Sequence, residues 1–125
     1  VSLLPDNPDY SAQLIKRHVH EVLGVEVGVI ISDTFGRPWR EGATNVAIGI
    51  AGLSPIQDYR GQKDPDGYPL RTTTIGIADE LASAGELVMG KLDRVPVAIV
   101  RGYVYDTSET GITDILRSPQ SDLFR

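Results

Sequence analysis

The sequence predicts an α/β protein in which a mixed sheet is flanked by helices. Two observations carry this prediction: segments with helical spacing of apolar residues alternate with short runs rich in Val and Ile, and Gly or Pro separates them. We expect helices at residues 9–23 and 78–89, and strands at 25–32, 45–51, 71–75 and 96–100. A chain of 125 residues can bury one core, so residues 1–125 are treated as a single domain.

The first helix is expected to begin near Asp9 or Ser11, either of which can cap it, and to end at Leu23, because Gly24 is a natural stop. Its apolar residues recur at helical spacing, which predicts one buried face. These residues are Leu14, Ile15, Val19, Val22 and Leu23.

In the strand at 25–32 one face is apolar (Val25, Val27, Val29 and Ile31) and Ile30 adds apolar surface to the other, which indicates burial on both sides. A polar loop is expected at 33–43. In 45–51 large residues alternate with small ones, so another element can approach the small face closely. Residues 52–69 form a long connector rich in Gly and Pro, and the β-branched run at 71–75 reads as a strand.

The second helix, 78–89, carries Asp79 and Glu80 in its first turn, where acidic side chains interact favourably with the helix dipole. The apolar run 96–100 is expected to form the last strand. The polar tail contains one short helical candidate at 112–116.

Composition excludes several classes of function. The net charge of −5, without a Lys/Arg cluster, argues against nucleic acid as a partner. The absence of Cys excludes disulfides and thiolate chemistry. No apolar stretch reaches membrane-spanning length and no signal-peptide pattern is visible, so we expect a cytoplasmic protein. The first residue is Val1 and not Met, so we expect a chain that is processed or that is a piece of a longer protein.

Asp33 and Thr34 follow the first expected strand, and their carboxylate and hydroxyl oxygens suit Mg²⁺ or Mn²⁺. The alternative is an Asx-turn or cap at the strand exit. Close by, Arg37 and Arg40 can hold phosphate or carboxylate groups, with Trp39 between them. Here the alternative is that the tryptophan seals the edge of the core and the arginines are solvated.

Met89, Gly90 and Lys91 end the second helix and can present backbone N–H groups and a cation to phosphate. Spacing alone favours the alternative, a helix C-cap followed by a lysine that interacts favourably with the helix dipole. Neither a Walker A motif nor a G-x-G-x-x-G fingerprint is present. His18 and His20 are two residues apart on a helix, so a metal pair is not expected.

Taken together, these segments resemble the coenzyme F420-0:γ-glutamyl ligase family in collinear order over nearly the whole chain. The resemblance rests on 31–42 (ISDTFGRPWREG), 45–52 (NVAIGIAG) and 58–61 (DYRG), and on four further motifs. These are 78–82 (ADELA), 86–91 (ELVMGK), 95–102 (VPVAIVRG) and 122–125 (DLFR).

The resemblance implies a GTP-dependent ligase that adds L-glutamate to coenzyme F420-0 by amide bond formation. It further implies Mg²⁺ or Mn²⁺ dependence and a homodimer. By resemblance, Asp33 and Thr34 are metal ligands, and the turn at Met89, Gly90 and Lys91 lies against the nucleotide. No general base is implied.

The N-terminal part of the family pattern is absent, so the chain is expected to be a fragment of a longer ligase. Two alternatives to a GTP-dependent F420-0 ligase stay open. One is a related ligase that acts on a different acid, and the other is a non-catalytic fragment that forms dimers.

Overall fold

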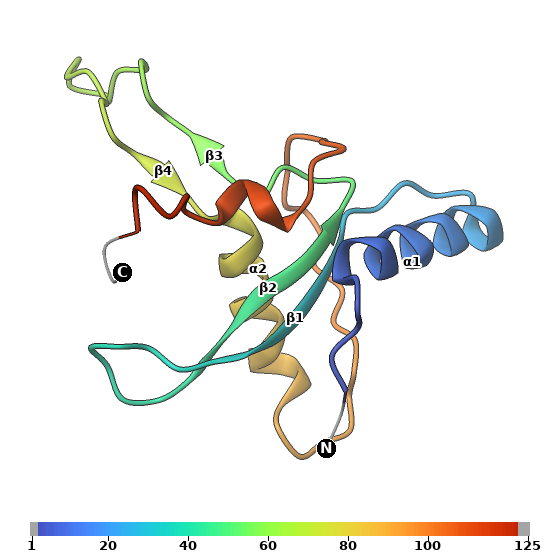
Figure 1. Cartoon of the computed structure of the whole chain (residues 1–125). Helices are drawn as coiled ribbons and strands as arrows, with labels where there is room; N and C mark the ends of the chain where they lie inside the picture. The colour runs from blue at the N-terminus through green and yellow to red at the C-terminus, as the bar shows by residue number, and fades with distance from the viewer. Residues whose placement is uncertain (1–2, 123–125) are drawn as a thin grey trace.

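The computed structural model describes residues 3–122 and has helices packed on a small sheet (Figure 1). This arrangement confirms the predicted mixed α and β class. The strands pair as two separate two-stranded antiparallel sheets, β1 with β2 and β3 with β4. The elements in chain order are α1 Pro8–Leu23, β1 Val29–Phe35, β2 Thr44–Ala51, β3 Gln57–Asp58, β4 Thr74–Ile75, α2 Ile77–Met89 and the 3₁₀ helix η1 Ile112–Ile115.

The β1–β2 hairpin crosses the middle of the molecule, and α1 and α2 both pack on it. Its pairing runs from Val29 opposite Ala51 to Phe35 opposite Thr44, with a register shift between Ile31 and Ser32. The prediction that the first strand spans 25–32 is therefore wrong at both ends. Residues 25–28 leave α1 without a pairing partner, whereas the backbone after Ser32 continues to pair with β2.

Helix α1 begins at Pro8, one residue before the predicted start of the helix at residue 9. Its N-cap is Asn7, whose side chain accepts a hydrogen bond from the Tyr10 backbone N–H, so the predicted cap at Asp9 or Ser11 is wrong. The predicted stop is confirmed: Gly24 adopts the left-handed conformation (φ 66°) and donates to the His20 carbonyl.

Asp9 has a different role, because its side chain reaches out of the helix to two other segments. Its Oδ1 accepts hydrogen bonds from the backbone N–H of Ile50 in β2, at 2.8 Å, and of Ile112 in η1, at 3.1 Å. Helix α2 repeats this device, since Asp79 Oδ1 accepts from the Ala47 N–H at 2.9 Å. In each helix, an aspartate of the first turn thus accepts a hydrogen bond from a backbone N–H of β2 that is not paired with β1.

The core lies where the two helices meet β2. Ile50 is fully buried and packs in one cluster with Ala47, Leu53 and Ala78. The expectation that the small residues of β2 allow close packing is confirmed at Gly49, where an added Cβ would collide with the backbone of Pro8 at the start of α1.

The long connector folds into an arm that projects from the body (Figure 1). It contains β3 and an isolated bridge between Lys63 and Pro69, and the expected strand at 71–75 is reduced to the two residues of β4. Only Gln57 and Asp58 pair with that strand, which limits its length.

The predicted strand at 96–100 is wrong: within the described residues this run has no regular secondary structure and pairs with no strand. The short helix expected at 112–116 is present as η1. In the part of the chain that the structure describes, no helix is long and apolar enough to cross a membrane.

Candidate functional site

Asp33 and Thr34 lie within β1 and not in a loop after it, as the sequence had suggested. Both residues pair with β2, Asp33 opposite Val46 and Thr34 opposite Asn45. The Asp33 carboxylate accepts a hydrogen bond from the Thr34 backbone N–H at 2.7 Å. Because Thr34 and Asn45 are directly opposite in an antiparallel pair, their side chains share one face of the hairpin.

The Thr34 hydroxyl is the point at which three segments meet. It accepts a hydrogen bond from Lys91 Nζ at 2.9 Å and donates to Asn45 Oδ1 at 3.3 Å. The lysine comes from the turn after α2 and is 57 positions away in sequence. The structure therefore brings together two sites that the sequence could only place separately, the Asp33–Thr34 pair and the turn that contains Lys91.

Asn45 is a site residue that sequence reasoning missed. Its position in the hairpin register, opposite Thr34, is the signal that could have identified it. The backbone at this position is fixed from α2, because Ser83 Oγ donates to the Asn45 carbonyl at 2.8 Å and lies 2.9 Å from Thr44 Oγ1. Helix α2 thus holds both the start of β2 and the turn that carries Lys91.

Met89 and Gly90 form the end of α2, as predicted. Gly90 has φ 61° and donates its N–H to the Glu86 carbonyl, which is the geometry of a helix C-cap. The Met89 methyl group packs near Gly85 on the preceding turn. Capping and a contact with nucleotide are compatible, since the cap orients the following residue, Lys91, toward Thr34.

Arg37 and Arg40, the two predicted anion-binding residues, lie in the loop that joins β1 to β2. The guanidinium of Arg37 donates from Nε to the Gly42 carbonyl at 3.1 Å and from Nη2 to the Glu41 carbonyl at 2.7 Å. The Arg37 side chain therefore bridges the two ends of the loop to which it belongs. Arg40 and Trp39 are exposed, the tryptophan to 82%, so it does not seal the core.

The oxygen donors at this site suit a hard divalent cation. The Asp33 carboxylate, the Thr34 hydroxyl and the Asn45 amide oxygen come from adjacent positions of one hairpin. Mg²⁺ is commonly held by one or two carboxylates, with water and substrate phosphate as the other ligands. Among residues 3–122, no group of three or more His, Cys, Asp or Glu side chains could hold a metal by itself.

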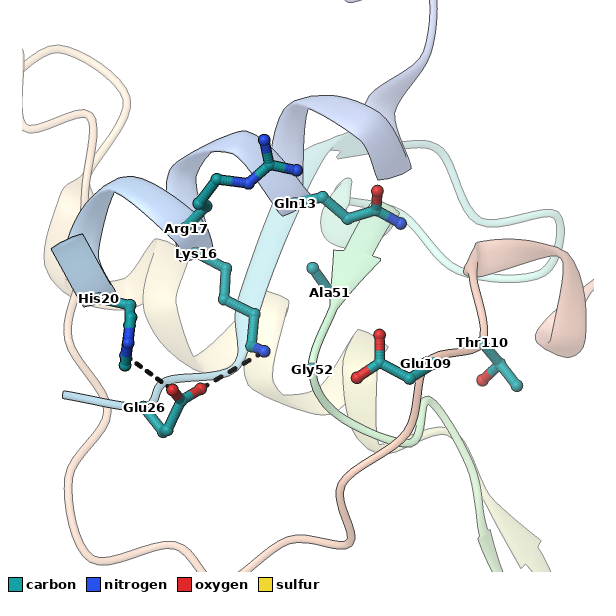
Figure 2. A pocket seen from close by; sticks show the side chains of 9 residues that line it. All are labelled: Gln13, Lys16, Arg17, His20, Glu26, Ala51, Gly52, Glu109 and Thr110. Atoms are coloured by element: carbon teal, nitrogen blue, oxygen red, sulfur yellow. Dashed lines mark ion pairs between the residues drawn. The ribbon is translucent and has the colours of Figure 1, made fainter. Parts of the chain in front are cut away.

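A separate polar cavity of about 310 Å³ lies beside α1, away from the hairpin loop (Figure 2). Lys16 and His20 on its wall both contact Glu26, at 3.4 and 2.7 Å. Two carboxylates, Glu26 and Glu109, and two permanently cationic side chains, Lys16 and Arg17, line the cavity, so it does not offer an open anion site. The other lining residues are Gln13, Arg17, Ala51, Gly52, Glu109 and Thr110.

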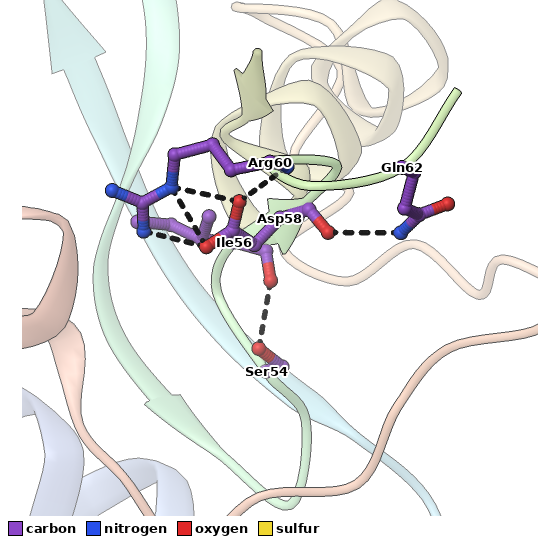
Figure 3. Close-up of polar contacts among 5 residues, drawn as sticks. All are labelled: Ser54, Ile56, Asp58, Arg60 and Gln62. Carbon is purple, nitrogen blue, oxygen red and sulfur yellow. Dashed lines mark hydrogen bonds and ion pairs between the residues drawn. The ribbon is translucent and has the colours of Figure 1, made fainter. Parts of the chain in front are cut away.

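The base of the projecting arm is ordered by a pair of charged residues (Figure 3). Arg60 donates from Nε and Nη2 to the Asp58 carboxylate, at 2.9 and 2.5 Å, and its backbone N–H donates to the same group. These hydrogen bonds, chiefly those from the guanidinium, lower the pKa of Asp58 to about 2. The pair is exposed, so it orders the arm locally and adds little to global stability.

Comparison with known proteins assigns the chain to the γ-glutamyl ligases. The particular family is F420-0:Gamma-glutamyl ligase, whose sequence pattern matches residues 1–102, and the chain belongs to it. The predicted resemblance is confirmed.

Two similar curated proteins are both named coenzyme F420:L-glutamate ligase. The one from Methanothermobacter thermautotrophicus is 51% identical over 125 residues, and the one from Methanocaldococcus jannaschii is 44% identical over 126 residues. These matches cover 98% and 100% of this chain but only 50% and 51% of the relatives. The chain therefore spans about half the length of the curated relatives it matches.

Proposed function

We propose that this chain supplies part of the cation and GTP site of a ligase that joins L-glutamate to coenzyme F420-0 through an amide bond. The observation that carries the proposal is the hydrogen bond from Lys91 to Thr34. It joins an oxygen-rich hairpin to a cationic turn, the two features needed to hold a metal-bound polyphosphate. The names of the relatives support the substrates, which are L-glutamate and coenzyme F420.

The chemistry explains why a nucleotide is expected. A carboxylate does not form an amide unaided, because its oxygen is a poor leaving group. Transfer of the γ-phosphoryl group of GTP to the carboxylate of F420-0 gives an acyl phosphate and GDP. The amine of L-glutamate then attacks the acyl carbon, the C–O bond to phosphate breaks, and inorganic phosphate and an amide are released with loss of the amine proton.

The residues of the chain take distinct roles in this proposal. Asp33 and Thr34 would hold Mg²⁺ or Mn²⁺, which neutralises phosphate charge when bound. The Lys91 ammonium would bind a phosphate oxygen, since it already lies at the Thr34 hydroxyl and carries a compact positive charge. Arg40, exposed in the loop between β1 and β2, stays a candidate for a substrate carboxylate or phosphate.

We also propose that the protein forms a homodimer and is located in the cytoplasm. A homodimer would cover part of the apolar surface that the described residues expose. A cytoplasmic location would supply the GTP that such a ligase consumes.

The test is calorimetric titration of GTP into this chain in the presence of Mn²⁺. We expect saturable binding by the wild type and at least a tenfold loss of affinity, about 1.4 kcal/mol, in Asp33→Asn. Asp66→Asn removes the same charge from the exposed arm and serves as the matched control. Equal binding by wild type and Asp33→Asn would contradict the role of Asp33, and no binding by the wild type would contradict a nucleotide site formed by this chain alone.

A further inference from the structure

The hydrogen bonds at the Thr34 hydroxyl have directions that follow from their donors and acceptors. A lysine ammonium can only donate, so Thr34 Oγ1 is the acceptor in its 2.9 Å contact with Lys91 Nζ. The hydroxyl gives its single proton to Asn45 Oδ1 at 3.3 Å. A hydroxyl oxygen has two lone pairs, and Lys91 takes one of them. The other lone pair of Thr34 can then face a cation.

The backbone of Asn45 is held from α2 independently of its side chain. Ser83 Oγ donates its one proton to the Asn45 carbonyl at 2.8 Å, so the Thr44 hydroxyl must be the donor in its 2.9 Å contact with Ser83 Oγ. Two residues further along β2, Asp79 Oδ1 accepts from the Ala47 N–H at 2.9 Å. Helix α2 therefore holds this part of β2 at two points, and the side chain of Asn45 stays available for Thr34.

The spacing of these two contacts explains why the helix and the strand fit one another. Asp79 and Ser83 are four residues apart, which is about 6 Å along a helix. Ala47 and Asn45 are two residues apart, which is about 6.8 Å along a strand. Because α2 also leads into the turn that carries Lys91, one helix positions both of the groups that bond to the Thr34 hydroxyl.

We propose that Asn45 is a positioning residue of the cation site: it takes the Thr34 proton and so directs a lone pair of that hydroxyl toward Mg²⁺ or Mn²⁺. The inference rests on the proposed function, in which Thr34 is a ligand. Without an acceptor, the hydroxyl is free to turn its proton toward the cation, which repels it. Groups that orient metal ligands in this way typically contribute about 10–100-fold to metal affinity.

The first test needs no metal and measures the χ1 rotamer of Thr34 in this chain by NMR, from the three-bond couplings of its methyl carbon. We expect one rotamer in the wild type and averaging among rotamers in Asn45→Ala. Asn45→Asp keeps an acceptor oxygen and cannot donate, so it should restore the single rotamer. Gln13→Ala, which removes an exposed amide of α1, is the matched control and should leave Thr34 unchanged.

The fold of Asn45→Ala should be intact, because Ser83 bonds to the backbone at this position and not to the side chain. Its thermal midpoint should therefore stay within about 2 °C of that of the wild type. A change in the Thr34 rotamer at an unchanged midpoint separates positioning of the hydroxyl from a general loss of structure.

The second test measures Mn²⁺ affinity in the presence of GTP, from the electron paramagnetic resonance signal of free manganese. Asn45→Ala should weaken the affinity about tenfold. In a Thr34→Val background the same substitution should change it less than twofold, because Asn45 acts through the hydroxyl. A tenfold loss that persists in Thr34→Val would mean that Asn45 contacts the cation directly, and would overturn the positioning role.

The outcomes separate this inference from the proposed function. A single Thr34 rotamer in Asn45→Ala, or manganese affinity in that variant equal to that of the wild type, would overturn the inference alone. A wild type that binds no manganese would contradict a cation site formed by this chain alone. The Thr34 rotamers would then still decide whether Asn45 orients the hydroxyl.

Discussion

Asp9 is expected to be a major determinant of stability, although it lies on the surface turn of a helix. Its carboxylate accepts the backbone N–H of Ile50 at 2.8 Å and of Ile112 at 3.1 Å. Ile50 is fully buried, so its amide has no access to water once this acceptor is removed. The substitution Asp9→Ala leaves both amides unsatisfied at once.

The magnitude follows from these two bonds. Each hydrogen bond to a charged acceptor contributes about 1.5–3 kcal/mol, and the first-turn charge adds about 0.3–1 kcal/mol. Because the terms are not fully additive, we expect Asp9→Ala to lower the free energy of unfolding by about 2–5 kcal/mol. That loss is a large share of a typical total of about 5–15 kcal/mol. Asp9→Asn retains one acceptor oxygen and should cost roughly half as much.

Urea and thermal unfolding followed by circular dichroism measure this effect. Asp9→Ala should lower the thermal midpoint by roughly 10 °C. Asp6→Ala, which removes an exposed carboxylate just before the same helix, is the matched control and should shift it by no more than about 2 °C. A midpoint for Asp9→Ala within the range of that control would refute the reasoning.

Three further predictions concern other parts of the chain. Gly49→Ala should destabilise the fold by about 1–3 kcal/mol in urea unfolding, because a Cβ there meets the backbone at the start of α1; an unchanged midpoint would show that the helix can yield. Asp58 should titrate at about pH 2 in carboxyl ¹³C NMR. Its pairing with Arg60 is therefore present above about pH 4 and is lost as the pH falls toward 2. Arg60→Gln should return the pKa of Asp58 toward 3.8. Lys91→Met should weaken GTP binding about tenfold in calorimetry while the thermal midpoint stays within about 2 °C, since the lysine's bond within residues 3–122 is to the exposed Thr34 hydroxyl; a large fall in the midpoint would make its role structural.

The helices were the most predictable part of the fold. Periodic apolar residues and the glycine stops at Gly24 and Gly90 mark their ends, because both features act locally. The cap at Asn7 was missed because Asp9 has the same local preference. Asp9 is instead engaged by Ile50 and Ile112, contacts that no local pattern encodes.

Strand limits were less predictable, because pairing depends on a partner that is distant in sequence. Thr34 and Phe35 extend β1 only because Asn45 and Thr44 lie opposite them. The apolar run at 96–100 shows the converse: its composition favours a strand, but no described segment pairs with it.

The candidate site was predicted residue by residue but not as an arrangement. Resemblance identified Asp33, Thr34 and Lys91 separately, and only the folded chain shows Lys91 at the Thr34 hydroxyl. Asn45 escaped notice because its relevance depends on the hairpin register. Arg37 carries the charge expected of a phosphate ligand, yet its guanidinium is engaged by carbonyls of its own loop.

The central claim is that the Asp33–Thr34 hairpin and Lys91 form one cation and nucleotide site. The most direct measurement is a crystal structure of this chain grown with Mn²⁺ and a non-hydrolysable GTP analogue, with manganese located by anomalous scattering. We predict manganese within about 2.5 Å of an Asp33 carboxylate oxygen and a phosphate oxygen, with Lys91 Nζ at hydrogen-bond distance from the polyphosphate. Manganese and nucleotide bound elsewhere, with Asp33 and Lys91 free of both, would contradict the account.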